Sequence, residues 1–150
     1  MRIISVINNP TKLKLIGLLI ILCFTLFIYS NHFENPFFFD DSHTIVSNSA
    51  ITTLDNWEAF FTDASTFSSL PANRAYRPMM TLMNAIDYHL AGGLNQRYYH
   101  IHIFFWYLVT IILFFVLCNY LFNNAIKENS NKNSIALASL FATLFFATHT

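Results

Sequence analysis

Three long apolar runs divide the chain, and each is nearly free of charged residues. A helix of about 20 apolar residues is long enough to cross a lipid bilayer. We therefore predict three transmembrane helices, over about residues 13–30, 98–122 and 133–150. The third run reaches Thr150 without a polar exit, so we interpret the third helix as truncated. Small residues in this run would let neighbouring helices approach closely, namely Ala136, Ala138, Ser139 and Ala142.

The first apolar run could also be a secretory signal peptide, because the basic residues Lys12 and Lys14 precede it. Its length favours a retained membrane anchor, and so does its exit, YSNHFEN, which has no small-x-small cleavage site. The two cysteines, Cys23 and Cys118, lie within apolar runs, and we expect both to be small buried side chains.

The segment between the first two runs, residues 31–97, has patterns of its own. Apolar residues at helical spacing occupy about 51–61, and a second apolar stripe begins after Pro78 and stops at Gly92. We predict two short amphipathic helices here that lie along the membrane surface. The expected fold class is therefore all-α: a polytopic membrane protein whose external loop carries two short helices.

Composition and charge agree with a membrane protein. The chain is 55% hydrophobic and 11% charged, against about 25% charged in soluble domains. Its net charge is zero, so we expect no nucleic-acid partner. Basic residues flank the first run and follow the second, at Arg2, Lys12, Lys14, Lys127 and Lys132, which predicts a cytoplasmic N-terminus and an extracytoplasmic loop 31–97. Many Asn, Phe and Ile and no eukaryotic targeting signal suggest a bacterial inner membrane and a periplasmic loop.

Two adjacent carboxylates, Asp40 and Asp41, are the first candidates for chemistry. They follow the apolar stretch 36–39 shortly after the first helix, where desolvation of a carboxylate pair is costly. One of them could be a general base that takes a proton from an acceptor hydroxyl. The pair could instead be a solvated turn or a helix cap. A divalent metal is possible here, although the loop shows no obvious further oxygen ligands.

Four other residues are candidates for binding substrate. Tyr76 and Arg77 precede the second amphipathic helix, and an Arg there can clamp a phosphate or contact lipid head groups. His100 lies at the start of the second apolar run, and His149 lies at the end of the third. Intramembrane ionisable groups are functional candidates, although a histidine at an interface can simply be hydrated. His102 is two residues from His100, on another helix face, so a shared metal site is not expected.

Four blocks in fixed order resemble a known family. They read FFFDDSHTIVSNSAI, YRPMMTLMNAIDYHL, YYH and LFATLFFATH, and they cover about Pro36 to Thr150. This order is similar to the start of the transmembrane and TPR-containing O-mannosyltransferases and their bacterial relatives, within the GT-C glycosyltransferases. The resemblance implies an inverting enzyme that uses a polyprenyl-phosphate sugar. It also implies that an aspartate of the pair is the base, that Arg77 faces the lipid phosphate or holds the loop, and that His100 and His149 match family histidines.

The function expected from the sequence is that of the N-terminal, GT-C-like transmembrane region of a membrane glycosyltransferase. It would transfer a sugar, mannose for example, from the lipid-linked donor to a protein or glycan hydroxyl at the outer membrane face. The alternative is a non-catalytic membrane fragment or assembly module, because three helices make an incomplete donor pocket, and we expect the isolated 150 residues to be inactive. A transporter subunit is disfavoured because the apolar runs contain no carboxylate.

Overall fold

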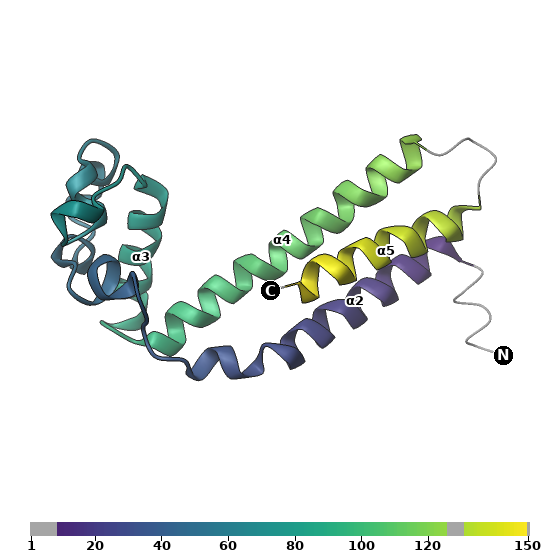
Figure 1. Cartoon of the computed structure of the whole chain (residues 1–150), viewed down its shortest axis with the longest axis horizontal. Coiled ribbons are helices and arrows are strands. Elements are labelled where there is room, and N and C mark those ends of the chain that lie inside the picture. Colours follow the sequence, from purple (N-terminus) through teal and green to yellow (C-terminus); the bar gives the residue numbers. More distant parts are fainter. Residues whose placement is uncertain (1–8, 126–130, 150) are drawn as a thin grey trace. The chain divides into compact units, whose positions relative to one another are not determined.

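The structure is a computed structural model that describes residues 9–125 and 131–149 (Figure 1). Four α-helices form its main elements, α2 (Pro10–Ile28), α3 (Pro78–Ala91), α4 (Gln96–Ala125) and α5 (Lys132–Thr148). Short helical turns fill the segment between α2 and α3: η1 (Ser30–Glu34), η2 (Ser42–Val46), η3 (Ser49–Thr52), η4 (Trp57–Phe61), η5 (Ala64–Phe67) and η6 (Pro71–Asn73). Within the described residues all regular structure is helical, which confirms the all-α prediction.

The chain divides into two compact units. The helical unit contains the described residues up to Ser30 and from Phe104 onward, and the loop unit contains residues 31–103. Helix α4 begins in the loop unit and continues into the helical unit. Two residues used to predict the topology, Arg2 and Lys127, lie outside the described residues.

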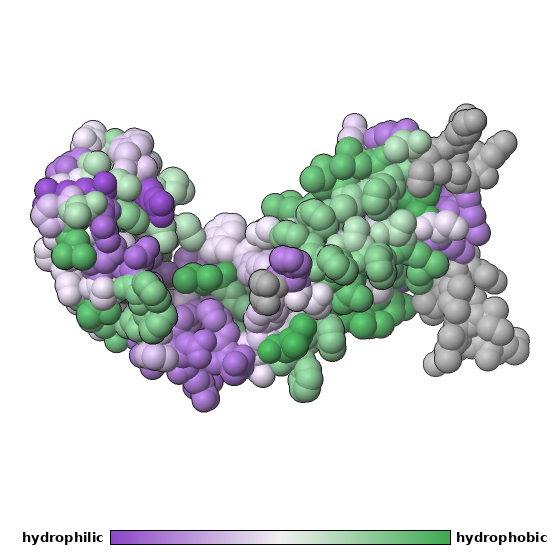
Figure 2. All heavy atoms as spheres, in the orientation of Figure 1, coloured by the Kyte–Doolittle hydropathy of each residue, from purple (hydrophilic) through white to green (hydrophobic). Residues whose placement is uncertain are grey.

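Helices α2 and α4, with 19 and 30 residues, are long and apolar enough to cross a membrane. Helix α5 is apolar but has 17 residues, so the third span stays a prediction. Large apolar side chains on these helices are exposed, such as Phe27 (76% exposed) and Phe141 (70%). Figure 2 shows hydrophobic side chains in green along these helices. A surface this apolar is suited to lipid rather than to water, so the chain has the character of a membrane protein.

Close packing of α2 against α5 holds the helical unit together. The core combines Ile21 of α2 with Ile111 of α4 and Leu140 of α5. At Gly17 the helices approach so closely that an added Cβ would lie 2.9 Å from Leu140 Cδ2 and closer still to Cδ1. Glycine therefore permits this contact, as small residues commonly do between membrane helices.

Small residues on α5 contribute to this interface only in part as predicted. Ala136 and Ser139 are fully buried, whereas Ala142 is half-buried and Ala138 is exposed. The buried Ser139 hydroxyl donates to the Ile135 carbonyl, so its burial leaves no unsatisfied polar group. Of the two cysteines, Cys118 is buried as expected, but Cys23 is exposed on α2, where an apolar thiol suits a lipid-facing helix.

The first predicted amphipathic helix is wrong. Residues 51–61 form two separate 3₁₀ turns, η3 and η4, and Thr53 between them is extended, with φ −140° and ψ 152°. The Thr53 hydroxyl accepts a hydrogen bond from the Asp55 backbone N–H at 3.1 Å. Such local side-chain bonds compete with helix formation. The apolar residues of this segment do not form one exposed stripe, because Ile51 and Phe60 are buried in the core of the loop unit.

The second predicted helix is confirmed as α3. Pro78 occupies its first turn, and Gly92 ends it in the left-handed region with φ 71°. The buried face differs from the predicted apolar stripe, since it carries Thr81, Asn84, Ala85 and Asp87, while Met79 at the start of the stripe is 59% exposed. Polar partners inside the loop unit make this burial possible, since the Thr81 hydroxyl donates to the Arg77 carbonyl and Asp87 contacts His102.

Candidate functional site

The two adjacent aspartates have different environments. Asp41 Oδ2 accepts a hydrogen bond from the Phe38 backbone N–H at 3.0 Å, and so closes the turn that precedes η2. Asp40 makes no such bond, and its side chain is 81% exposed. The apolar stretch before them ends at Phe39, whose φ of 50° is rare for a bulky residue. The turn therefore uses Asp41 to hold its shape and presents Asp40 to the surroundings.

A buried histidine lies directly behind Asp40. His43 is 6% exposed, and its Nε2 lies 3.4 Å from Asp40 Oδ1. Its Nδ1 lies 3.0 Å from Ser68 Oγ, and its Nε2 lies 2.9 Å from Asn73 Nδ2. The backbone carbonyl of His43 also accepts a hydrogen bond from the Ser69 N–H at 3.0 Å. The aspartate turn is thus joined to the segment 68–73, more than twenty residues further along the chain.

The predicted arginine contacts the residue that immediately precedes this segment. Arg77 Cζ lies 5.2 Å from the centre of the Phe67 ring, a cation–π contact. Phe67 is buried and immediately precedes Ser68, the partner of His43. Asp40 and Arg77 are therefore both attached to residues 67–73, one through His43 and the other through Phe67. Tyr76 is 62% exposed, and its hydroxyl donates to the Phe61 carbonyl at 2.9 Å, which anchors the chain before α3.

The aspartate turn does not assemble a full ligand set for a metal. No group of three or more His, Cys, Asp or Glu side chains is placed to hold an ion anywhere in residues 9–125 and 131–149. One oxygen of Asp41 is already bonded to the turn backbone. Divalent cations such as Ca²⁺ take six or more oxygen ligands, several of them from protein. The donor set that the loop unit provides does not fit a resident divalent cation.

His100 is buried rather than hydrated at a surface. It is 9% exposed, and its Nε2 lies 2.9 Å from the Asn35 carbonyl oxygen. Its Nδ1 is also buried and has no hydrogen-bond partner in the structure. The His32 ring stands against it at 4.5 Å, and burial, followed by the charge of His100, lowers the pKa of His32 below 6.5. His100 therefore ties the start of α4 to the segment that follows η1.

A second buried polar pair joins α3 to the start of α4. Asp87 Oδ1 lies 2.5 Å from His102 Nδ1, and the Asp87 side chain is 4% exposed. Burial raises the pKa of Asp87 above 3.8, and the hydrogen bond and charge of His102 oppose that rise. His100 and His102 have different partners, as expected for residues two positions apart on a helix.

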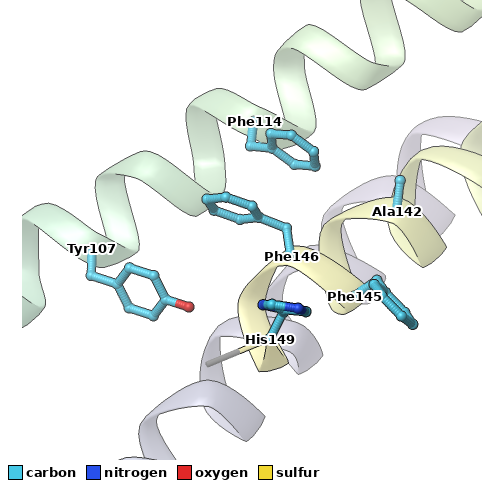
Figure 3. A pocket seen from close by; sticks show the side chains of 6 residues that line it. All are labelled: Tyr107, Phe114, Ala142, Phe145, Phe146 and His149. Carbon is cyan, nitrogen blue, oxygen red and sulfur yellow. The ribbon is translucent and has the colours of Figure 1, made fainter.

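His149 belongs to the helical unit, unlike the other predicted site residues. It follows the last residue of α5 and is exposed. A cavity of about 380 Å³ lies beside it, lined by Tyr107, Phe114, Ala142, Phe145, Phe146 and His149 (Figure 3). Phe114 and Phe146 stack at 4.4 Å on the wall of this cavity, and the Tyr107 hydroxyl donates to the Ala147 carbonyl.

Sequence reasoning missed His43 and Asp87. His43 follows Asp40 by three residues, the spacing that brings two side chains together in a helical turn, so its position could have marked it. Asp87 lies three residues after Asn84, and both are buried on α3. The apolar stripe of α3 drew attention to the opposite side of the helix.

Comparison with known proteins adds evidence on relationship. No protein-family model and no solved structure matches the chain. The protein O-mannosyl-transferase TMTC4 of Mus musculus is 31% identical over 156 residues, which cover 99% of this chain and 20% of that protein. The Homo sapiens protein of the same name is 31% identical over 153 residues, 97% of this chain and 20% of its own length.

The chain is similar to these O-mannosyl-transferases along nearly all of its length. This supports the resemblance found in the sequence at the level of a TMTC-like relationship. The chain spans about a fifth of the length of these relatives. We therefore treat the activity of a whole protein as a proposal. The wider GT-C assignment and the relationship to bacterial enzymes are proposals as well.

Proposed function

We propose that this chain is the N-terminal, GT-C-like region of a membrane glycosyltransferase that transfers mannose from a polyprenyl-phosphate donor to a hydroxyl of a protein. The observation that carries the proposal is the similarity to protein O-mannosyl-transferases together with an exposed carboxylate at Asp40, supported from behind by a buried histidine. In this scheme residues 31–97 face the outer side of the membrane, periplasmic in a bacterial cell, and the three apolar runs cross the bilayer.

The chemistry needs few groups from this chain. The acceptor oxygen attacks the anomeric carbon of mannose, the bond from that carbon to the phosphate oxygen breaks, and the configuration inverts. The polyprenyl phosphate leaves with the bonding electron pair, and Asp40 takes the proton of the acceptor hydroxyl. Because phosphate is already a good leaving group, a base and a nearby positive charge supply most of what the step requires.

The structure favours Asp40 over Asp41 as the base. A base must reach the acceptor hydroxyl, and Asp40 is exposed, while Asp41 is engaged with the Phe38 backbone. Arg77 is exposed and attached to the same segment through Phe67, which suits a contact with the donor phosphate. Tyr76, His100 and His149 are proposed as further substrate contacts, on the family resemblance.

The test compares two Asp→Asn variants in membranes from cells that express the whole protein. Mannose transfer from a radiolabelled polyprenyl-phosphate donor to an acceptor peptide is measured. We expect Asp40→Asn to lower the rate about 10²- to 10⁴-fold, the usual contribution of a general base. Asp55→Asn, an exposed aspartate of the same unit, is the matched control and should leave the rate unchanged. Full transfer by Asp40→Asn would refute the assignment of the base.

A second candidate function is that of a non-catalytic membrane module. Among the described residues two helices are long and apolar enough to cross a membrane, and so few spans would make an incomplete pocket for a lipid-linked donor. The two candidates predict different results for the 150-residue chain alone in lipid vesicles with donor and acceptor. Transfer by the isolated chain would exclude the second candidate.

A further inference from the structure

The side chain of His43 does more than anchor the aspartate turn. The backbone of His43 already binds the segment 68–73, because its carbonyl accepts from both the N–H and the hydroxyl of Ser69, at 3.0 and 3.2 Å. Turn closure is likewise provided by Asp41. The imidazole ring is therefore not required for either of these connections, although it is buried and bonded at both nitrogens.

The ring orientation is fixed by two polar partners. Ser68 Oγ lies 3.0 Å from Nδ1, and the Leu70 backbone N–H donates to the same Oγ at 3.0 Å. Asn73 lies against Nε2 at 2.9 Å. The Ser68 hydroxyl also lies 3.1 Å from the Leu70 carbonyl, to which it can donate instead. A proton on Nε2 requires this hydroxyl to turn and donate to Nδ1, and the Asn73 amide to present its oxygen rather than Nδ2 to the ring; a hydroxyl and an amide can both make this exchange by rotation.

A proton on Nε2 would face the carboxylate of Asp40. The separation of 3.4 Å between Nε2 and Asp40 Oδ1 is longer than a strong hydrogen bond, but it places the buried ring nitrogen beside the exposed carboxylate. A general base works only when its oxygen is held in reach of the hydroxyl it deprotonates, and a displacement of about 1 Å can cost 10²-fold in rate.

We propose that His43 is a positioning residue, which holds the Asp40 carboxylate in its working orientation through Nε2. This inference rests on the proposed function, because it takes Asp40 as the base. It adds a residue to the site and explains why a buried imidazole is bonded at both nitrogens behind an exposed acid.

Two variants divide the roles of the ring. His43→Gln places an amide near the position of Nε2 and gives up the contact with Ser68. His43→Asn places an amide near the position of Nδ1, keeps the contact with Ser68 and gives up the edge that faces Asp40. Each variant keeps the contacts of one ring nitrogen and loses those of the other. If the role of His43 is purely structural, both variants should lose similar amounts of stability and of activity.

The measurement is kcat and the KM for the polyprenyl-phosphate mannose donor in the whole protein, with thermal unfolding in parallel. We expect His43→Asn to lower kcat about 10- to 100-fold at unchanged KM, and we expect His43→Gln to restore most of it. Equal kcat for the two variants, or losses that follow their unfolding temperatures, would overturn the proposal.

Asp40→Asn, measured in the same series, distinguishes a failure of the proposed base from a failure of the positioning role. If Asp40→Asn is inactive but His43→Asn has the wild-type rate, the positioning role fails and the proposed base stands. If Asp40→Asn is active, the proposed base fails.

A second readout does not depend on activity. The ¹⁵N chemical shift of His43 Nε2 should move in Asp40→Asn and stay in place in Asp55→Asn. An unmoved Nε2 signal in Asp40→Asn would also overturn the proposal.

Discussion

The close contact between α2 and α5 at Gly17 gives a prediction whose size follows from the structure. Gly17→Ala adds one methyl group at a point where its Cβ would lie 2.9 Å from Leu140 Cδ2 and nearer still to Cδ1. Leu140 is 8% exposed and part of the core, so its whole side chain must shift. Overpacking of this kind costs about 1–3 kcal/mol. We expect Gly17→Ala to lower the free energy of unfolding by that amount.

A double-mutant cycle identifies the cause of the loss. Leu140→Ala alone should cost about 2–5 kcal/mol, because it leaves a cavity. In the double variant the methyl group at position 17 enters the space that Leu140 has left, so the cost of the glycine substitution should largely disappear. The two single effects should therefore be non-additive by about 1–3 kcal/mol.

The assay is unfolding of the protein in mild detergent by titration with sodium dodecyl sulfate, followed by circular dichroism. Leu113→Ala is the control, since Leu113 lies on α4, is 62% exposed and does not line the groove around Gly17 and Leu140. Its effect should add to that of Gly17→Ala within about 0.5 kcal/mol. Additivity of Gly17→Ala with Leu140→Ala would refute this account of the α2–α5 contact.

Two further predictions concern the loop unit. Burial raises the pKa of Asp87, so the stability that this group contributes is fully present below pH 3.8 and is lost as the pH rises through its folded-state pKa. The unfolding temperature of Asp87→Asn should therefore lack this pH-dependent loss. The control Asp55→Asn should retain it. Asn48 is buried, and its Nδ2 donates to carbonyls at 44, 66 and 67 over 3.0–3.2 Å. Asn48→Ala should therefore cost about 1–3 kcal/mol, against a negligible change for the exposed Asn56→Ala, and equal unfolding temperatures for the two would contradict it.

The sequence predicts the long elements well because their signal extends over many residues. The charge-free runs produce α2 and α4, and Pro78 and Gly92 mark both ends of α3. The helix predicted over 51–61 was wrong because apolar spacing alone cannot show that a threonine hydroxyl will accept a hydrogen bond from the backbone N–H two residues further on. Short segments are decided by such single local bonds.

The candidate site was predictable in part, for a related reason. Asp40 and Asp41 stand out in the sequence, whereas His43 gains its importance from Ser68 and Asn73, which lie 25 and 30 residues away. Contacts over such distances depend on how the turns of the loop unit pack, and no local pattern encodes them. The same is true of Asp87, whose partner lies in the next helix.

The unequal roles of the two aspartates arise from the backbone rather than from their chemistry. As neighbours in sequence they are chemically identical, and either could be the base. The left-handed conformation at Phe39 turns the chain so that Asp41 reaches back to the Phe38 N–H, and Asp40 is left pointing outward. A bulky residue in this region costs about 1–2 kcal/mol, and strain of this kind persists only where surrounding contacts impose it. Here those contacts come from Asp41 and from His43, so the same bonds that hold the strained turn also select Asp40 as the exposed acid.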